Sequence, residues 1–134
     1  MACCRRASSG AYYALFHCLA RECADLLIGG NSAERSKEAW RQVYRALEHV
    51  PCKERCKKKA MIKLFPKGVE DFANAFITLQ DKRHLADYDP FAIFVKSSVH
   101  ADIELAQQAI AGFQAESTKD RRAFCAYVLF KRRE

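Results

Sequence analysis

Residues that interrupt a helix are rare in this chain and fall at only a few places. The sequence has 5 Gly and 3 Pro among 134 residues. Because Gly and Pro are the strongest local breakers of helices, long uninterrupted segments remain between them. Apolar residues in those segments recur every three or four positions, which is typical of amphipathic helices. The sequence therefore predicts an all-α fold.

Five helices are expected from these breaks. They span residues 5–28, 33–50, 69–88, 91–112 and 117–129. Ser32 is expected to cap the second helix, which stops before Pro51 because the residue preceding a proline disfavours the α conformation. Asp89-Pro90 pairs a capping residue with a proline suited to the first helical position, so it predicts the start of the fourth helix.

Chain length and connections suggest how these helices pack. A chain of 134 residues can bury one core, and we expect a single domain over residues 1–134. Short connections favour antiparallel neighbours. The predicted architecture is an up-and-down bundle of four to five antiparallel helices.

Aromatic side chains are abundant on the predicted helices. They include Tyr12, Tyr13, Phe16, Trp40, Phe72, Phe76, Phe91 and Phe94. One bundle seam does not easily accommodate so many rings, and surplus apolar surface usually marks an interface. The sequence therefore favours a homodimer.

Charge and cysteine content narrow the functional classes. Lys and Arg number 23 against 16 Asp and Glu, a net charge of +7 that favours phosphate groups without sequence specificity. The sequence has 7 Cys, and neither a leader nor an apolar stretch of ~20 residues is recognisable in it. These features predict a cytoplasmic chain with reduced thiols and no membrane contact. His49, Cys52 and Cys56 lack the paired spacing of zinc modules, so no metal or other cofactor is expected.

Two segments combine polar and aromatic groups. Residues 9–17 read Ser-Gly-Ala-Tyr-Tyr-Ala-Leu-Phe-His, and Tyr13 and His17 share a helix face because they lie four positions apart. Residues 83–90 read Arg-His-Leu-Ala-Asp-Tyr-Asp-Pro, with Arg83 and Asp87 at the same spacing. Taken alone, the first is a packed helix with one titratable group and the second is a charged helix end.

Together, the two segments resemble the HEPN domain, a small helical bundle named from higher eukaryotes and prokaryotes nucleotide-binding. The matching positions are Arg5, Arg6, Ser9 through His17, Arg83, Ala86, Asp87 and Tyr88. The match is closest to small stand-alone bacterial members and covers nearly the whole chain. The resemblance implies a helical homodimer that binds nucleotide or RNA. It also suggests a toxin–antitoxin or phage-defence system, with an antitoxin or a nucleotidyltransferase as partner.

Many members of this family are metal-independent ribonucleases that pair an arginine with a histidine at the dimer cleft. The nearest candidate here is Arg45 with His49, which is one residue short of the family spacing. Four positions along one helix would place both side chains on one face. There Arg45 could clamp a phosphate while His49 moves a proton. A solvated basic stripe is the alternative interpretation.

A pocket of imidazole, guanidinium and phenol groups is a second candidate site. It would bring His17 and Tyr13 of the first helix against Arg83 and Tyr88, and could hold a nucleotide. Alternatively, His17 hydrogen-bonds Asp87 or Tyr88 in a structural network, because buried polar groups need partners.

The connection over residues 52–63 is polar and strongly basic, with room for a turn or two of helix. Its central run is Lys57, Lys58 and Lys59. This run is either a contact for RNA or a solvated surface.

Three functions therefore remain open. The chain binds nucleotide or RNA, or it is a ribonuclease using Arg45 and His49, or it is a degenerate HEPN-like bundle that serves as a dimerising scaffold. Salt-dependent RNA binding that weakens when the lysine run is neutralised would support the first. RNA left intact would exclude the second.

Overall fold

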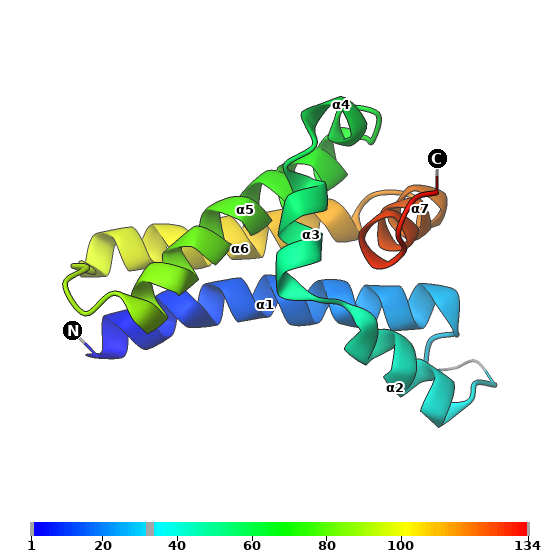
Figure 1. The fold of residues 1–134 in the computed structure, drawn as a ribbon, viewed down its shortest axis with the longest axis horizontal. Helices are drawn as coiled ribbons and strands as arrows, with labels where there is room; N and C mark the ends of the chain where they lie inside the picture. Colours follow the sequence, from blue (N-terminus) through cyan, green and yellow to red (C-terminus); the bar gives the residue numbers. More distant parts are fainter. Residues whose placement is uncertain (1, 32–33, 134) are drawn as a thin grey trace.

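A computed structural model describes residues 2–31 and 34–133 of the chain. Within these ranges the structure has seven helices and no strand, so the all-α prediction is confirmed (Figure 1). The helices are α1 (Ala2–Leu27), α2 (Lys37–Ala46), α3 (His49–Cys56), α4 (Lys59–Ile62), α5 (Lys67–Tyr88), α6 (Lys96–Gln114) and α7 (Thr118–Leu129). The number exceeds four to five because the basic connection folds into α3 and α4. None of the described helices is long and apolar enough to cross a membrane.

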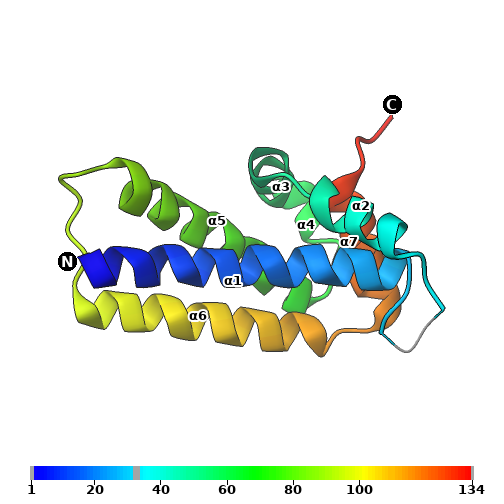
Figure 2. The same ribbon diagram turned by 90° about the horizontal axis from the view of Figure 1, so that it is seen from below.

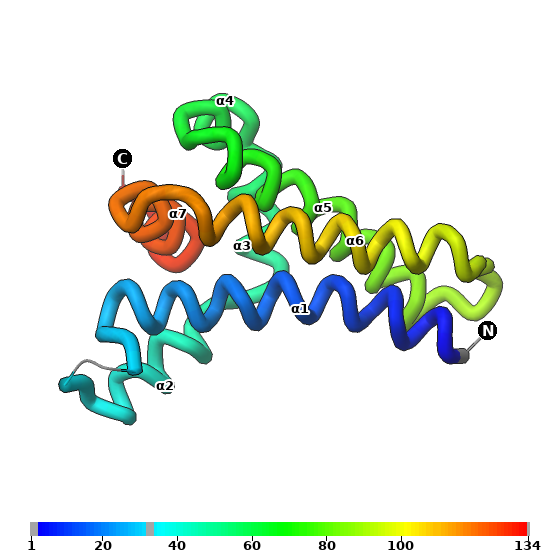
Figure 3. The backbone as a smooth tube through the Cα atoms, turned by 180° about the vertical axis from the view of Figure 1, so that it is seen from behind, coloured from blue at the N-terminus to red at the C-terminus, as the bar shows by residue number. Residues whose placement is uncertain are grey.

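The long helices α1, α5 and α6 pack against one another along most of the molecule. Helix α5 runs antiparallel to both α1 and α6, so α1 and α6 lie side by side in the same direction (Figures 1 and 2). Helix α7 turns across one end of α1, and α3 packs against α5 and α7 (Figure 3). The short helices thus lie across the long ones, and α1 and α6 are parallel neighbours where antiparallel ones were expected.

Aromatic rings fill the core between the long helices and α7. The largest fully buried side chains include Tyr12, Phe72, Phe76, Phe113 and Phe124. The ring of Phe113 lies between those of Phe72, 4.9 Å away, and Phe124, 5.8 Å away. Close packing of such rings supplies much of the apolar burial that stabilises the domain.

Burial in this core removes the aromatic surface on which the sequence argument for a homodimer depended. Of the eight rings named for it, those buried inside this chain are Tyr12, Phe16, Phe72, Phe76 and Phe94. Tyr13 and Trp40 are half-buried, and Phe91 is 89% exposed. A homodimer therefore needs a different argument.

The second predicted helix is divided in two. Its proposed cap, Ser32, lies outside the described residues, and the side chain of Ser36 caps α2 by accepting a hydrogen bond from the backbone of Ala39. Helix α2 stops at Ala46 because Leu47 has extended backbone and a buried side chain. The helix end predicted at Pro51 is wrong, since α3 runs through this proline from His49 to Cys56. Pro51 then lies in the first turn of α3, where its missing N–H costs little.

The helix start predicted at Asp89-Pro90 is wrong, since α6 begins only at Lys96. The carboxylate of Asp89 accepts a hydrogen bond from the backbone of Phe91, 2.9 Å away, and so closes a turn. The guanidinium of Arg5 holds the connecting segment 89–95 from across the fold. It donates hydrogen bonds to the carbonyl oxygens of Ala86, Asp89, Pro90 and Ala92.

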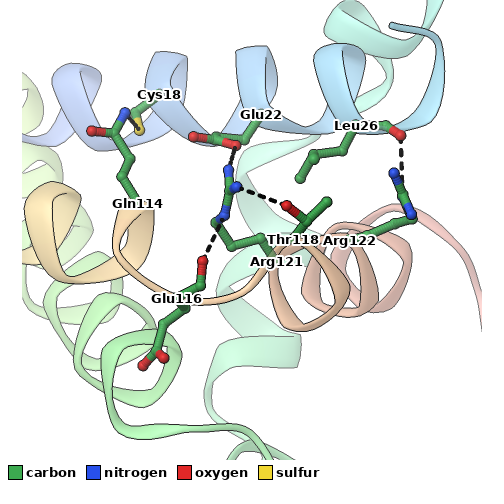
Figure 4. A network of polar contacts seen from close by, with 8 residues as sticks. All are labelled: Cys18, Glu22, Leu26, Gln114, Glu116, Thr118, Arg121 and Arg122. Atoms are coloured by element: carbon green, nitrogen blue, oxygen red, sulfur yellow. Dashed lines mark hydrogen bonds and ion pairs between the residues drawn. The ribbon is translucent and has the colours of Figure 1, made fainter. Parts of the chain in front are cut away.

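Helix α7 is fastened to α1 by two arginines (Figure 4). Nη1 of Arg121 donates to Oε2 of Glu22 over 2.7 Å, and both side chains are largely buried. The Nε of Arg121 also donates to the carbonyl oxygen of Glu116 over 3.1 Å. Arg122 donates to the carbonyl oxygen of Leu26 over 3.3 Å. These charge-assisted bonds fix α7 across the end of α1.

Candidate functional site

Four aromatic side chains of α1 and α2 lie in a row that we call the aromatic ladder: Tyr13, His17, Tyr44 and Trp40. Ring centroids are 6.1 Å apart for Tyr13 and His17, 6.2 Å for His17 and Tyr44, and 5.2 Å for Tyr44 and Trp40. The corresponding interplanar angles are 26°, 12° and 22°. Each neighbouring pair is therefore stacked.

Local helix geometry and the contact between α1 and α2 build the ladder. Tyr13 and His17 are one helical turn apart on α1, and Trp40 and Tyr44 are one turn apart on α2. A hydrogen bond of 2.9 Å joins Nδ1 of His17 to the hydroxyl of Tyr44. The indole of Trp40 donates to the carboxylate of Asp25 on α1 over 2.9 Å. These two bonds hold the helices in register.

A guanidinium lies at each end of the ladder. The Cζ atom of Arg35 is 4.9 Å from the ring centroid of Trp40, and an ion pair of 3.1 Å ties this arginine to Asp25. The Cζ atom of Arg83, on α5, is 5.8 Å from the ring centroid of Tyr13. Cations over aromatic faces are attracted by the ring quadrupole. The ladder thus presents aromatic surface between two fixed positive charges.

Arg83 is largely enclosed by its neighbours, with a side chain that is 12% exposed. Its Nη1 lies 3.6 Å from the carboxylate of Asp87, and its guanidinium also covers Tyr12 at 5.3 Å. The buried Nε has no hydrogen-bond partner within the described part of the chain. A buried donor without a partner is costly, so this guanidinium has a hydrogen-bonding capacity that the described contacts leave unused.

His49 of α3 lies beside the ladder in a second group of rings. Its Nδ1 is 2.6 Å from the hydroxyl of Tyr12, and its ring stacks on Phe16 with centroids 3.9 Å apart. Burial lowers the pKa of His49, and the charges of Arg83 and His17 lower it further. Burial also raises the pKa of Tyr12. Near neutral pH the contact is therefore a hydrogen bond between two uncharged groups.

The predicted ribonuclease pair does not share a helix face. Arg45 is an exposed residue in the last turn of α2, whereas His49 opens α3. Between them Leu47 and Glu48 have extended backbone, because the side chain of Leu47 turns into the core. The geometric expectation for Arg45 and His49 is therefore wrong.

The two segments that carry the HEPN resemblance do meet in the fold. The hydroxyl of Ser9 donates to the carboxylate of Asp87 over 2.6 Å, and Arg83 covers the ring of Tyr13. These contacts join α1 to the last turns of α5. The phenol that meets Arg83 is thus that of Tyr13, and Ser9 adds a hydrogen bond between the two segments.

His17 and Tyr88 do not take part as predicted. His17 bonds to Tyr44 and not to Asp87 or Tyr88. Tyr88 is 66% exposed, and its ring packs against His84 with centroids 4.9 Å apart. Tyr88 is the last residue of α5, and its side chain lies on the exposed surface, whereas that of the preceding Asp87 reaches Ser9 of α1.

The lysine run lies apart from the aromatic ladder, where α3 passes into α4 (Figure 1). Lys57 forms an ion pair of 3.8 Å with Glu54 on the surface. The amine of Lys59 donates to the side-chain oxygen of Asn74 over 2.9 Å. Lys58 is exposed and lines a separate cavity, considered below.

From the sequence, Trp40 and Tyr44 were expected only on the apolar face of the second helix, and not in a functional site. The signal that could have identified them is their spacing, which matches that of Tyr13 and His17. Which side of α1 receives α2 depends on the chain between them, and no local pattern reveals it. Arg35 was likewise missed, because it precedes α2 and reaches the ladder only through the fold.

No protein-family model, curated protein or solved structure matches the chain. Within the described ranges, no three His, Cys, Asp or Glu side chains gather as a metal site requires, and Cys52 and Cys56 are buried in the core. The ladder and its two arginines are therefore the basis for a functional proposal.

Proposed function

We propose that this chain is a HEPN-like protein that binds RNA, with unpaired bases held at the aromatic ladder. The observation that carries the proposal is the row of four stacked rings between Arg35 and Arg83. Proteins that bind single-stranded nucleic acid combine aromatic platforms with positive charge, and each stacked base contributes about 1–3 kcal/mol.

The ladder is accessible to such a ligand. His17 is exposed, and Tyr13, Trp40 and Tyr44 are half-buried, so each of these side chains retains surface that a ligand can contact. The guanidinium of Arg83 lies over the ring of Tyr13 and adds positive charge at that end of the ladder. A net charge of +7 attracts the polyanion over a longer range.

The family assignment rests on the resemblance, and contacts between its two motifs support it. Two contacts, that of Ser9 with Asp87 and that of Tyr13 with Arg83, give a physical reason for the two motifs to occur in one chain. A role in a toxin–antitoxin or defence system, with an antitoxin or nucleotidyltransferase partner, is an expectation of that resemblance alone.

We also propose a homodimer, on a new argument. Apolar side chains are exposed where α5 ends and along the segment that follows it: Leu85, Tyr88, Phe91, Ile93 and Val95. Arg5 holds the backbone of this segment in place, so the exposed side chains are presented in a fixed arrangement. Several exposed apolar side chains within one short segment are typical of interaction sites.

The test is the affinity for a fluorescently labelled oligouridylate, measured by anisotropy. We expect Tyr44→Ala and His17→Ala each to weaken binding about tenfold, which corresponds to ~1.4 kcal/mol for the loss of one ring. Leu64→Ala is the control, because it removes an exposed apolar side chain outside the ladder and outside the proposed dimer surface. Unchanged affinity in both ladder variants would refute the proposal.

The same samples decide between the other two functions. Cleavage of the oligonucleotide that disappears in His49→Gln would favour a ribonuclease, although by a geometry other than the one predicted. A folded chain with no affinity for RNA at low salt would favour the dimerising scaffold.

A further inference from the structure

A second cationic site lies at the other end of α3 from His49. A cavity of about 510 Å³ opens between the end of α3, α4 and the segment that follows α7. Its cationic lining consists of Arg55, Lys58, Lys131, Arg132 and Arg133. No acidic residue of the described chain lines it.

Hydrogen bonds fix the walls of this cavity. Nη1 of Arg55 donates to the carbonyl oxygen of Val128 over 2.7 Å, and the hydroxyl of Tyr127 donates to the carbonyl oxygen of Arg55 over 2.6 Å. These reciprocal bonds clasp α3 to α7. Arg132 reaches across to Sδ of Met61 at 3.2 Å. The positive charges are therefore gathered by the fold as well as by the sequence.

Within residues 2–31 and 34–133, no ion pair compensates the charge of the cavity. Among the described residues, ion pairs occupy arginines elsewhere in the molecule, such as Arg35, Arg83 and Arg121, but none of the five cations of the cavity. A concave surface with charge of one sign concentrates ligands of the opposite sign. The cavity is suited to a ligand with more than one negative charge.

The lining also contains aromatic surface, which favours nucleic acid over a simple anion. The ring of Phe130 is 59% exposed at the cavity, and Tyr127 forms part of its wall. A base can stack on an exposed ring while neighbouring phosphates meet the cations. Inorganic phosphate would use only the charge.

Helix α3 connects this cavity to the aromatic ladder. Its first residue, His49, lies beside the ladder, and Arg55 near its other end lines the cavity. Eight helical residues span ~12 Å. One strand of several nucleotides can therefore reach both places, and a mononucleotide cannot.

We propose that the cavity formed by Arg55, Lys58 and residues 131–133 binds the phosphate backbone of the RNA strand whose bases occupy the aromatic ladder. This inference rests on the proposed function and adds to it that the ligand is an oligonucleotide. The cavity supplies affinity that depends on salt and length, and the ladder supplies stacking.

The experiment compares two triple variants of equal charge. Lys131→Gln, Arg132→Gln and Arg133→Gln change a segment outside any helix, so α7 should be preserved. The control triple, Arg6→Gln, Lys96→Gln and Lys119→Gln, removes the same charge from exposed positions away from the cavity. Affinity for oligouridylates of increasing length is measured over a range of salt concentrations, with circular dichroism as the check on folding.

For a long oligouridylate we expect the cavity triple to lower the slope of log K against log salt concentration by about 2, because each lost phosphate contact contributes ~0.7. The control triple should change it much less. For a dinucleotide, which covers only the ladder, both variants should bind as the unmodified chain does. Equal slopes in the two triple variants would overturn the inference. Binding of heparin as tight as that of the oligouridylate would also overturn it, because it would assign the cavity to polyanions in general.

The two proposals fail in different ways. If ladder variants weaken binding and the cavity triple does not, the cavity inference is wrong and the ladder proposal stands. If the cavity triple abolishes binding while Tyr44→Ala and His17→Ala have no effect, the ladder proposal is wrong and the strand is held by its backbone alone.

Discussion

The hydroxyl of Tyr12 and Nδ1 of His49 lie 2.6 Å apart and join α1 to the first residue of α3. Tyr12 is fully buried, so its hydroxyl requires a partner inside the protein. By taking that role, His49 ties the first residue of α3 to α1, directly after the break made by the buried Leu47. This contact thus joins α1 to α3 beside the ladder formed by α1 and α2.

Acid should destabilise the protein through His49. The pKa of this imidazole is lowered in the folded state, mainly by burial, relative to about 6.5 in the unfolded chain. Below that value the unfolded state binds more protons, so the free energy of unfolding falls as pH drops through ~6.5 and below. Urea denaturation at a series of pH values should show this loss. The slope of the free energy of unfolding against pH should flatten in His49→Gln. It should persist in His100→Gln, which changes an exposed histidine. Equal slopes in the two variants would contradict the role of His49.

Two glycines should respond to alanine in opposite directions. Gly10 lies within α1, and a Cβ atom there would have no neighbour within 4 Å, so Gly10→Ala should raise the free energy of unfolding by about 1 kcal/mol. At Gly68 a Cβ atom would collide with the carbonyl oxygen of Gly112 on α6, so Gly68→Ala should lower it. Thermal or urea denaturation measures both. A loss of stability in Gly10→Ala would show that α1 packs differently.

Replacing Arg5 by lysine should loosen the segment between α5 and α6. One ammonium group cannot reproduce the planar guanidinium that donates to four carbonyl oxygens there. We expect Arg5→Lys to lower the free energy of unfolding by about 1–3 kcal/mol. Arg6→Lys, at an exposed neighbouring position, is the control. Identical stability of the two variants, measured in urea, would contradict the anchoring role of Arg5.

Charged substitutions at the exposed apolar segment should separate the proposed homodimer. Phe91 is 89% and Ile93 is 78% exposed, so aspartate at both positions removes apolar surface without disturbing the core. Light scattering after size-exclusion chromatography should give the mass of two chains for the unmodified protein and of one for the double variant. A monomeric unmodified chain would contradict the dimer.

The predictable parts of the fold are those decided by neighbours in sequence. Helix α5 follows from apolar spacing, and α7 begins at Thr118, within one residue of its expected start. The start of α6 was mispredicted because Arg5, far away in the sequence, occupies the carbonyl groups before it. The turn or two of helix expected within residues 52–63 is present as the end of α3 and as α4, but the start of α3 at His49 was not predicted.

The candidate site was predictable to the same extent. Spacing on one helix correctly places Tyr13 against His17. Spacing alone fails for Arg45 and His49, because the burial of Leu47 ends the helix between them. Half of the ladder comes from α2, and its position depends on contacts between helices that no local pattern encodes.

The central claim is that RNA bases meet the aromatic ladder, and the fluorescence of Trp40 tests it most directly. The chain has 1 Trp, so any change in indole emission reports on the ladder. Titration with a short oligouridylate should quench this emission in a saturable way, and Tyr44→Ala should weaken the response about tenfold. RNA that binds with unchanged Trp40 emission, or with the same affinity in Tyr44→Ala, would contradict the account.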